Sequence, residues 1–286
     1  VTIDEIKGIF FDVSKMTEPV PIHLAQAKCY AFIYALQNHH HEIGVRMTYV
    51  NLDTEEVRYF YVRYTFEELE AWFLALMREY KKWAQFQYEQ RIIRQESIKG
   101  LEFPFSYRKG QKDLVSGVYR TILREKNLFI QAPPGTGKTI STLFPAIKAV
   151  GEGYGDKIFY LTAKTITAAV ARETLENFYE KGYRAKTIQI TAKEKLCMME
   201  ETACNPDACP YAKGHFDRVN DAVYELITAS DEMSREILVE QARKWKVCPH
   251  EMSLDVSLWV DAIICDYNYV FDPNAHLRRF FGEGNK

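Results

Sequence analysis

Apolar and polar positions follow one rhythm before residue 100 and another after it. The first stretch mixes two-residue alternation with helical spacing. It predicts a strand over 1–7, a helix over 22–38, a β-hairpin over 44–64 and a long helix over 66–95. Thr65 and Glu68 have the spacing of a capping box, so the long helix is expected to begin directly after the hairpin.

The second rhythm alternates short apolar strands with helices. The predicted strands lie at 128–130, 157–162, 186–191 and 261–266. Strands that alternate with helices form a parallel sheet with right-handed crossovers. A segment with Gly100 and Pro104, residues 97–106, separates the two rhythms. We therefore predict two domains of the α/β class, residues 1–100 and 101–286.

One loop in the second half fits a phosphate-binding pattern. Between a predicted strand and a predicted helix lie Ala132, Pro133, Pro134, Gly135, Thr136, Gly137, Lys138 and Thr139. Glycines let the backbone turn its N–H groups around a phosphate, and the helix N-terminus adds partial positive charge. Lys138 brings a full charge to the outer phosphates, and the Thr139 hydroxyl can ligate Mg²⁺. This pattern predicts a nucleotide site.

The strand rhythm breaks over 192–258, where four of the six cysteines gather. Cys197, Cys204 and Cys209 have the spacing C-x6-C-x4-C, and Cys248 follows after a gap of 38 residues. Four thiolates can hold an iron–sulfur cluster or zinc, and unligated buried thiols are a third interpretation. The spacing alone leaves all three open.

Composition narrows the class of protein. The 286 residues are 47% hydrophobic, which is enough for a core, and the net charge is −2. Any nucleic-acid contact must therefore come from local basic patches. No run of about eighteen apolar residues predicts a membrane span. Six cysteines in an intracellular-looking chain argue against a disulfide framework, so we expect a cytoplasmic protein without a membrane partner.

Acidic motifs are sparse where a phosphate-loop ATPase needs them. After Thr139 no apolar strand ends in Asp-Glu, and the nearest such pair, Asp231-Glu232, lies in a polar, helix-like stretch. The Mg²⁺-coordinating carboxylates and the water-positioning residue of phosphoryl-transfer catalysis are therefore missing. We expect this chain alone to bind nucleotide weakly and to be inactive as an ATPase.

An ordered set of motifs resembles the DinG/XPD helicases, which are superfamily 2 helicases with an iron–sulfur domain. The set is Tyr107–Gln111, Ala132–Thr139, Tyr160–Thr165, Lys195–Cys197, Cys204, Cys209-Pro210, Cys248-Pro249 and Asp266–Pro273. The resemblance implies a RecA-like parallel-sheet motor domain with an iron–sulfur domain inserted at about 192–258. The family continues beyond the Asp266–Pro273 stretch to an Asp-Glu-Ala-His motif and a second motor domain, and this chain ends first.

The same resemblance implies roles for particular residues. It assigns a 4Fe-4S cluster to Cys197, Cys204, Cys209 and Cys248. It places Arg108 and Gln111 near the nucleotide base, and it turns residues 160–165 toward single-stranded DNA.

Residues 1–100 resemble the C-terminal half of a RecB-type PD-(D/E)xK nuclease, a restriction-endonuclease-like α/β domain. Glu5-Ile-Lys7 matches the (D/E)-x-K motif, and Gln26 and Tyr30 match the Gln-x3-Tyr helix. In such a site a carboxylate holds Mg²⁺ and the lysine orients or activates the attacking water. The other motifs of that site would precede Val1.

Together these resemblances imply a piece of an ATP-dependent DNA helicase that acts on single-stranded and forked duplex DNA in repair or replication, coupled to a metal-dependent nuclease. The alternative from another class is a nucleotide- and DNA-binding module with a structural four-cysteine zinc and no catalysis. A third interpretation is a scaffold that keeps both folds without chemistry.

Overall fold

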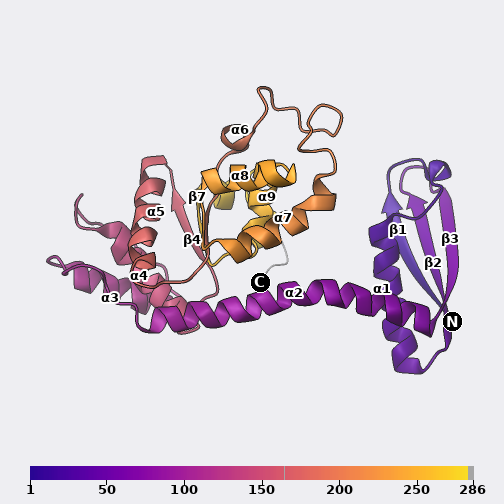
Figure 1. The fold of residues 1–286 in the computed structure, drawn as a ribbon, viewed down its shortest axis with the longest axis horizontal. Helices are drawn as coiled ribbons and strands as arrows, with labels where there is room; N and C mark the ends of the chain where they lie inside the picture. Colours follow the sequence, from indigo (N-terminus) through magenta and orange to yellow (C-terminus); the bar gives the residue numbers. More distant parts are fainter. Residues whose placement is uncertain (164, 283–286) are drawn as a thin grey trace. The chain divides into compact units, whose positions relative to one another are not determined.

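The computed structural model describes residues 1–163 and 165–282, and the chain divides into two compact units, Val1–Gln85 and Phe86–Lys286 (Figure 1). None of the helices within these described residues is both long and apolar enough to cross a membrane.

The first unit is a three-stranded sheet with one helix packed on it. The strands β1 (Thr2–Ile9), β2 (Glu42–Asn51) and β3 (Val57–Thr65) lie in the order β1-β2-β3. β1 and β2 run parallel, and β2 and β3 form the predicted antiparallel hairpin. A short 3-10 turn, η1 (Val13–Lys15), and helix α1 (Pro21–Asn38) connect β1 to β2. The predicted strand, helix and hairpin of this region are confirmed.

Alternation along β2 explains why α1 packs on one face. Ile43, Val45, Met47 and Tyr49 are all buried and face the helix. The buried positions of α1 include Ala27, Ala31 and Ala35, whose small side chains allow a close approach to the sheet. Because Glu5 pairs in register with Met47, the Glu5 side chain points to the same face as this core. The nuclease-like motif is thereby held against α1.

Helix α2 (Phe66–Lys99) belongs to both units, because the division between them falls at residues 85 and 86. Its start is the predicted capping box: the Glu68 N–H donates to Thr65 Oγ1 at 3.2 Å, and the Thr65 N–H donates to Glu68 Oε2 at 2.9 Å. The helix runs four residues beyond the predicted end at 95. Composition placed the domain boundary at 97–106, whereas the last turns of α2 pack into the second unit.

The second unit is built on a four-stranded sheet. The order of β4 (Ile158–Thr162), β5 (Thr187–Gln189), β6 (Glu232–Met233) and β7 (Ala262–Asp266) is β4-β7-β5-β6, and every pairing is parallel, as predicted. The helices α3 (Gln111–Leu123), α4 (Lys138–Gly151) and α5 (Thr165–Tyr179) precede or connect the strands. Ile147, Leu175, Phe178 and Ile264 are among the buried residues of the common core.

The cysteine-bearing insertion lies between β5 and β7. It contains α6 (Lys193–Leu196), α7 (His215–Ala229), α8 (Arg235–Trp245) and α9 (Pro249–Val256), with the loop after α6 visible above α8 and α9 in Figure 1. Two short helices, α10 (Asn268–Phe271) and α11 (Arg278–Phe281), follow β7.

Two sequence predictions are wrong. Residues 128–130 do not form a strand: the segment pairs with none of the described strands, and Phe129 is 96% exposed. An apolar run becomes a strand only when its backbone can form hydrogen bonds with a neighbouring strand. The Asp231-Glu232 pair is not in a helix-like stretch either, because Glu232 begins β6, which extends the sheet beside β5.

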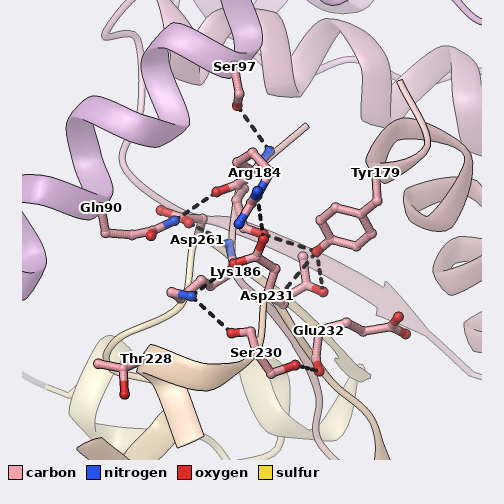
Figure 2. Close-up of polar contacts among 12 residues, drawn as sticks. Gln90, Ser97, Tyr179, Arg184, Lys186, Thr228, Ser230, Asp231, Glu232 and Asp261 are labelled. Atoms are coloured by element: carbon pink, nitrogen blue, oxygen red, sulfur yellow. Dashed lines mark hydrogen bonds and ion pairs between the residues drawn. The ribbon is translucent and has the colours of Figure 1, made fainter. Parts of the chain in front are cut away.

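Asp231 belongs to a polar network at the amino ends of the strands (Figure 2). Lys186 Nζ, on a side chain that is 5% exposed, donates to Asp231 Oδ1 at 3.0 Å, and Arg184 Nε donates to Asp231 Oδ2 at 2.7 Å. From α2, Gln90 Nε2 donates to the Arg184 carbonyl, and Ser97 Oγ accepts from the Arg184 N–H. The network ties the end of α2 to the sheet edge, so this Asp-Glu pair has a structural role.

Candidate functional site

The phosphate-binding pattern folds into a tight loop that ends on α4. Gly135 and Gly137 have φ angles of 78° and 72°, in the left-handed region that favours glycine. Gly137 is the N-cap of α4, and no side chain caps the helix there. The first N–H groups of α4 are therefore available to an anion. Lys138 Nζ donates to the carbonyls of Ala132 at 3.0 Å and Pro133 at 2.9 Å, which keeps the ammonium over the loop.

Gln111 and Arg108 hold this loop from the side. Gln111, 6% exposed, accepts from the Arg108 N–H at 3.0 Å through Oε1 and donates to the Thr136 carbonyl at 3.3 Å through Nε2. The Arg108 guanidinium donates to the Gly135 carbonyl. The structure thus brings together the two residues and the loop that the resemblance grouped around a nucleotide.

A side chain from β4 reaches the same loop. Tyr160 OH donates to Thr139 Oγ1 at 3.4 Å, which orients the hydroxyl proposed for Mg²⁺. Within the loop, Thr136 Oγ1 donates to the Pro133 carbonyl at 2.9 Å. Pro134 lies in the turn between Pro133 and Thr136. Of the segment expected to face DNA, residue 164 lies outside the described residues.

A cavity of about 1300 Å³ opens at the carboxyl ends of the strands. It is bordered by Thr162 of β4, Gln189 of β5 and Asp266 of β7, and ligands of open parallel sheets bind at this end. Its lining also includes the basic residues Arg172, Lys193, Lys195, Arg235, Arg278 and Arg279. Of these six, the sequence singled out only Lys195, as part of the Lys195–Cys197 motif; the other five carry no motif of their own.

The four clustered cysteines line a second cavity, of about 360 Å³. Cys197 follows α6, Cys204 and Cys209 lie in the loop before α7, and Cys248 is the N-cap of α9. All four are free thiols, and burial raises the pKa of the Cys248 thiol. Their convergence on one cavity fits a sulfur-ligated group. Among the described residues, however, no group of three or more His, Cys, Asp or Glu side chains is placed so that it could hold a metal ion.

His215, a residue that the sequence did not single out, borders the same cavity. Its side chain is buried, and its Nδ1 accepts from the Cys248 N–H at 3.2 Å. Burial lowers the pKa of its imidazole. No sequence spacing signals this contact, because the two residues are 33 positions apart.

In the first unit the four nuclease-like residues form one hydrogen-bonded chain. Lys7 Nζ lies 2.8 Å from Glu5 Oε1 and donates to Gln26 Oε1 at 2.9 Å. Gln26 Nε2 donates to Tyr30 OH at 3.1 Å. The neighbouring Asp4 points to the opposite face, where it pairs with Arg46 at 2.5 Å, and that hydrogen bond lowers the pKa of Asp4. Glu5 is thus the carboxylate that β1 presents toward α1.

Comparison with known proteins places helicase sequence over most of the second unit. A DEAD/DEAH box helicase model matches residues 113–221, and a DEAD_2 model matches residues 177–281. The chain is 21% identical over 224 residues to the human regulator of telomere elongation helicase 1. It is 23% identical to the homologues of that protein from Oryza sativa subsp. japonica, over 229 residues, and from Arabidopsis thaliana, over 219 residues.

The alignments with the human, rice and Arabidopsis proteins cover 61%, 60% and 61% of this chain. They cover 18%, 22% and 21% of those three proteins, in the same order. The chain therefore spans about a fifth of the length of the curated relatives it matches. The similarity to DEAD/DEAH box helicase and DEAD_2 domains thus extends over residues 113–281 of this chain.

Proposed function

We propose that this chain is part of an ATP-dependent DNA helicase, with the phosphate-binding loop as its nucleotide site. The observation that carries the proposal is the clamp on that loop: Gln111 and Arg108 hold the carbonyls of Thr136 and Gly135, and the loop ends on the open N-terminus of α4. The first helicase match begins two residues after Gln111. Because Gln111 and Arg108 fix the loop and the N–H groups at the start of α4 have no side-chain cap, the loop is arranged to bind phosphate.

The chemistry at this loop is binding and charge neutralisation. Lys138 exchanges its two loop carbonyls for phosphate oxygens, and the α4 N–H groups add hydrogen bonds to the same anion. Thr139, oriented by Tyr160, supplies a hydroxyl for Mg²⁺. When bound, Mg²⁺ neutralises the charge that develops on the phosphates.

The test compares this chain with a longer protein that includes a second motor domain. In the longer protein, single-stranded DNA should stimulate ATP turnover. Lys138→Ala should abolish that turnover, whereas Lys181→Ala, at an exposed lysine after α5, should leave it unchanged. Robust turnover by the 286-residue chain alone would contradict the expectation that it lacks catalytic carboxylates. Asp266, at the carboxyl end of β7, would then become the first suspect, because Asp261 is held in an ion pair with Arg94 at the opposite end of that strand.

We propose single-stranded and forked duplex DNA as the macromolecular partner. The net charge of −2 offers no general attraction, but the cavity at the carboxyl ends of the strands is lined by six Lys and Arg side chains against three acidic ones, Glu194, Glu236 and Asp266. Thr162, from the segment expected to face DNA, borders the same cavity. Basic side chains at this edge provide the local positive charge that phosphate contacts need.

We propose a 4Fe-4S cluster as the group held by Cys197, Cys204, Cys209 and Cys248. The support is the convergence of all four thiols on one cavity, together with the resemblance to iron–sulfur helicases. When bound, such a cluster supplies a rigid cross-link between the loop and α9 and a redox-active centre. The competing structural zinc predicts a colourless protein, whereas a cluster gives a brown chain that absorbs near roughly 400 nm.

A second activity, metal-dependent DNA cleavage, rests on the chain of contacts from Glu5 to Tyr30. Lys7 lies between the Glu5 carboxylate and Gln26, which is where a lysine can orient a metal-bound water. In a longer protein with both nuclease halves, Glu5→Ala or Lys7→Ala should abolish Mg²⁺- or Mn²⁺-dependent cutting and leave ATP turnover intact. Glu18→Ala, at an exposed glutamate, is the matched control. A wild-type protein that never cuts DNA would contradict this activity.

A further inference from the structure

The wall of the cavity lined by the four cysteines includes a buried histidine, His215. His215 begins α7, is 4% exposed and borders the cavity together with Cys197, Cys204, Cys209 and Cys248. Its neighbour Phe216 packs edge-on against the ring, with centroids 5.2 Å apart. The imidazole is thus a buried polar group in the wall that the four cysteines share.

One hydrogen bond fixes which nitrogen of His215 carries the proton. The backbone N–H of Cys248 donates to Nδ1 at 3.2 Å, so Nδ1 must be the unprotonated, accepting nitrogen. The neutral ring then carries its hydrogen on Nε2, which makes Nε2 a donor. Within residues 1–163 and 165–282, Nε2 is buried and meets no hydrogen-bond acceptor. Folded proteins seldom leave a buried N–H without a partner, so the position calls for an acceptor.

The chemistry of the cavity identifies the class of acceptor. The cavity wall carries the four thiol sulfurs, and a sulfur-ligated cluster adds sulfide, which accepts hydrogen bonds from N–H groups. His250 also has a buried nitrogen without a partner among the described residues, but it borders both cavities and its acceptor is therefore not defined by the cysteines. His215 borders only the cysteine cavity of the two.

We propose that His215 Nε2–H donates a hydrogen bond to a sulfur of the bound iron–sulfur cluster or of one of its cysteine ligands. The inference rests on the cluster proposed above. His215 is then a positioning residue: through Nδ1 it holds the backbone of Cys248, and through Nε2 it tunes the centre. Because a donor to sulfur stabilises the more negative, reduced form, His215 raises the reduction potential of the cluster.

Two substitutions separate the two nitrogens. In His215→Asn the amide oxygen takes the place of Nδ1, so the contact with the Cys248 N–H is kept and the Nε2 donor is lost. In His215→Gln the amide nitrogen takes the place of Nε2, so the donor is kept and the Cys248 contact is lost. The full chain, reconstituted anaerobically with iron and sulfide, is titrated with dithionite as electron donor, and the midpoint potential and iron content are measured.

We expect both variants to assemble the cluster, His215→Asn to shift the midpoint to a more negative potential, and His215→Gln to stay near the wild type. An unshifted His215→Asn would overturn the role of His215 and leave the cluster itself standing. A wild-type chain that takes up no iron would overturn both, while the ATPase test at Lys138 would still judge the nucleotide site separately.

A measurement on the wild type guards against variants that fail to fold. Reduced protein grown with ¹⁵N-histidine should show a weak nitrogen coupling to the cluster spin by pulsed electron paramagnetic resonance. The coupling should disappear in His215→Gln, which has no imidazole at this position. Absence of any such coupling in the wild type would contradict the proposed hydrogen bond.

Discussion

Gly135 and Gly137 share a backbone requirement but differ in their surroundings. Both have φ angles near the left-handed region, so a side chain at either strains the loop by about 1–2 kcal/mol. A Cβ at Gly135 would meet nothing within 4 Å, whereas a Cβ at Gly137 would lie 2.6 Å from Gln111 Nε2. A side chain at Gly137 would therefore strain the backbone and also disturb Gln111, whereas one at Gly135 would only strain the backbone.

This difference predicts unequal effects of the same substitution. Gly137→Ala should displace the Gln111 side chain and break its bond to the Thr136 carbonyl, so nucleotide binding should weaken more than in Gly135→Ala. The measurement is nucleotide affinity in the longer protein, with thermal unfolding recorded alongside. Equal losses of affinity in the two variants would show that backbone strain alone decides and that the Gln111 clamp contributes nothing.

At the residue scale, local spacing predicted what local geometry could decide. Glu5 and Lys7 are two apart on a strand and Gln26 and Tyr30 are four apart on a helix, so each pair had to share a face, and the structure joins the two pairs. His215 could not be found this way. Its position depends on a contact with the Cys248 backbone across an intervening helix pair, and that contact leaves no periodic trace in the sequence.

The end of α2 is attached to the motor unit by a buried ion pair. Arg94 Nη1 lies 2.6 Å from Asp261 Oδ1, with side chains 6% and 12% exposed, and Asp261 Oδ2 accepts from the Lys186 N–H at 2.7 Å. The Asp261 carboxylate therefore joins α2 to the amino ends of β5 and β7. Lys148 of α4 adds hydrogen bonds to the last carbonyls of α2, including that of Ile98 at 2.9 Å.

Removing one partner of this pair leaves a buried charge. Arg94→Met should destabilise the second unit by about 3–5 kcal/mol, because Asp261 loses its counter-ion in a site with little water. Lys99→Met, in the exposed pair with Glu96 on the same helix, should cost at most about 0.5 kcal/mol. Denaturant unfolding of both variants is the measurement, and similar losses would mean that the Arg94 pair is energetically no different from a surface pair.

Lys157 at the start of the sheet gives the second unit a pH dependence. Burial lowers the pKa of Lys157 to about 8 from an ordinary value of 10.5. The folded chain therefore releases this proton before the unfolded chain does, and stability rises with pH between about 8 and 10.5 by at most about 1.4 kcal/mol per pH unit. Below about pH 8 the contribution is lost, because the ammonium is then buried as a charge.

The matched variant for this dependence is Lys157→Met, which removes the amine and keeps an unbranched side chain that is one atom shorter. The difference in unfolding free energy between wild type and Lys157→Met should move in favour of the wild type as the pH is raised from 7.5 to 9.5. Burial also raises the pKa of Cys265 to about 12, but this thiol is present in both proteins and cancels in the difference. A pH-independent difference would contradict the lowered pKa.

At the element scale, the sequence predicted helices better than the edges of the sheet. Helical periodicity and the capping box located α2 because both act within one segment. The apolar run at 128–130 and the polar pair at 231–232 were both misassigned, since strand formation depends on a partner elsewhere in the chain. Met233 of β6 finds that partner in Ile188 of β5, whereas Phe129 remains solvent-exposed.

At the scale of the whole molecule, three candidate sites occupy separate parts of the chain. The Glu5–Tyr30 contacts lie in the first unit, the phosphate loop on α4 in the second, and the cysteine cavity in the insertion between β5 and β7. The motifs of all three could be found from the sequence because each contains short segments in which a few residues have a recognisable spacing. The division of the chain inside α2 could not, because an unbroken helix carries no composition change at residue 85.

The loop of the insertion differs from the rest of the unit in how it is held. None of the residues 197–214 is buried, and between α6 and α7 they form turns and bends. A segment without a buried apolar core cannot balance the entropy of ordering its backbone by packing alone. Ligation by Cys197, Cys204 and Cys209 is then the main source of order in this loop, while α7 to α9 keep buried residues of their own, such as Val219, Leu238 and Met252.

This contrast predicts where damage to the cysteine site should spread. Cys204→Ser in the iron-loaded chain should lose iron and become protease-sensitive between residues 192 and 258, with the earliest cuts at 197–214. The cores of both units should stay resistant, because their buried residues do not depend on the loop. Cys29→Ser, at a cysteine in α1, is the matched control and should keep its iron and its cleavage pattern.

Limited proteolysis with mass spectrometry and iron analysis provides the readout. Full retention of iron by Cys204→Ser would remove Cys204 from the ligand set, and cuts appearing first in α7 to α9 would show that the whole insertion, rather than its loop, depends on ligation.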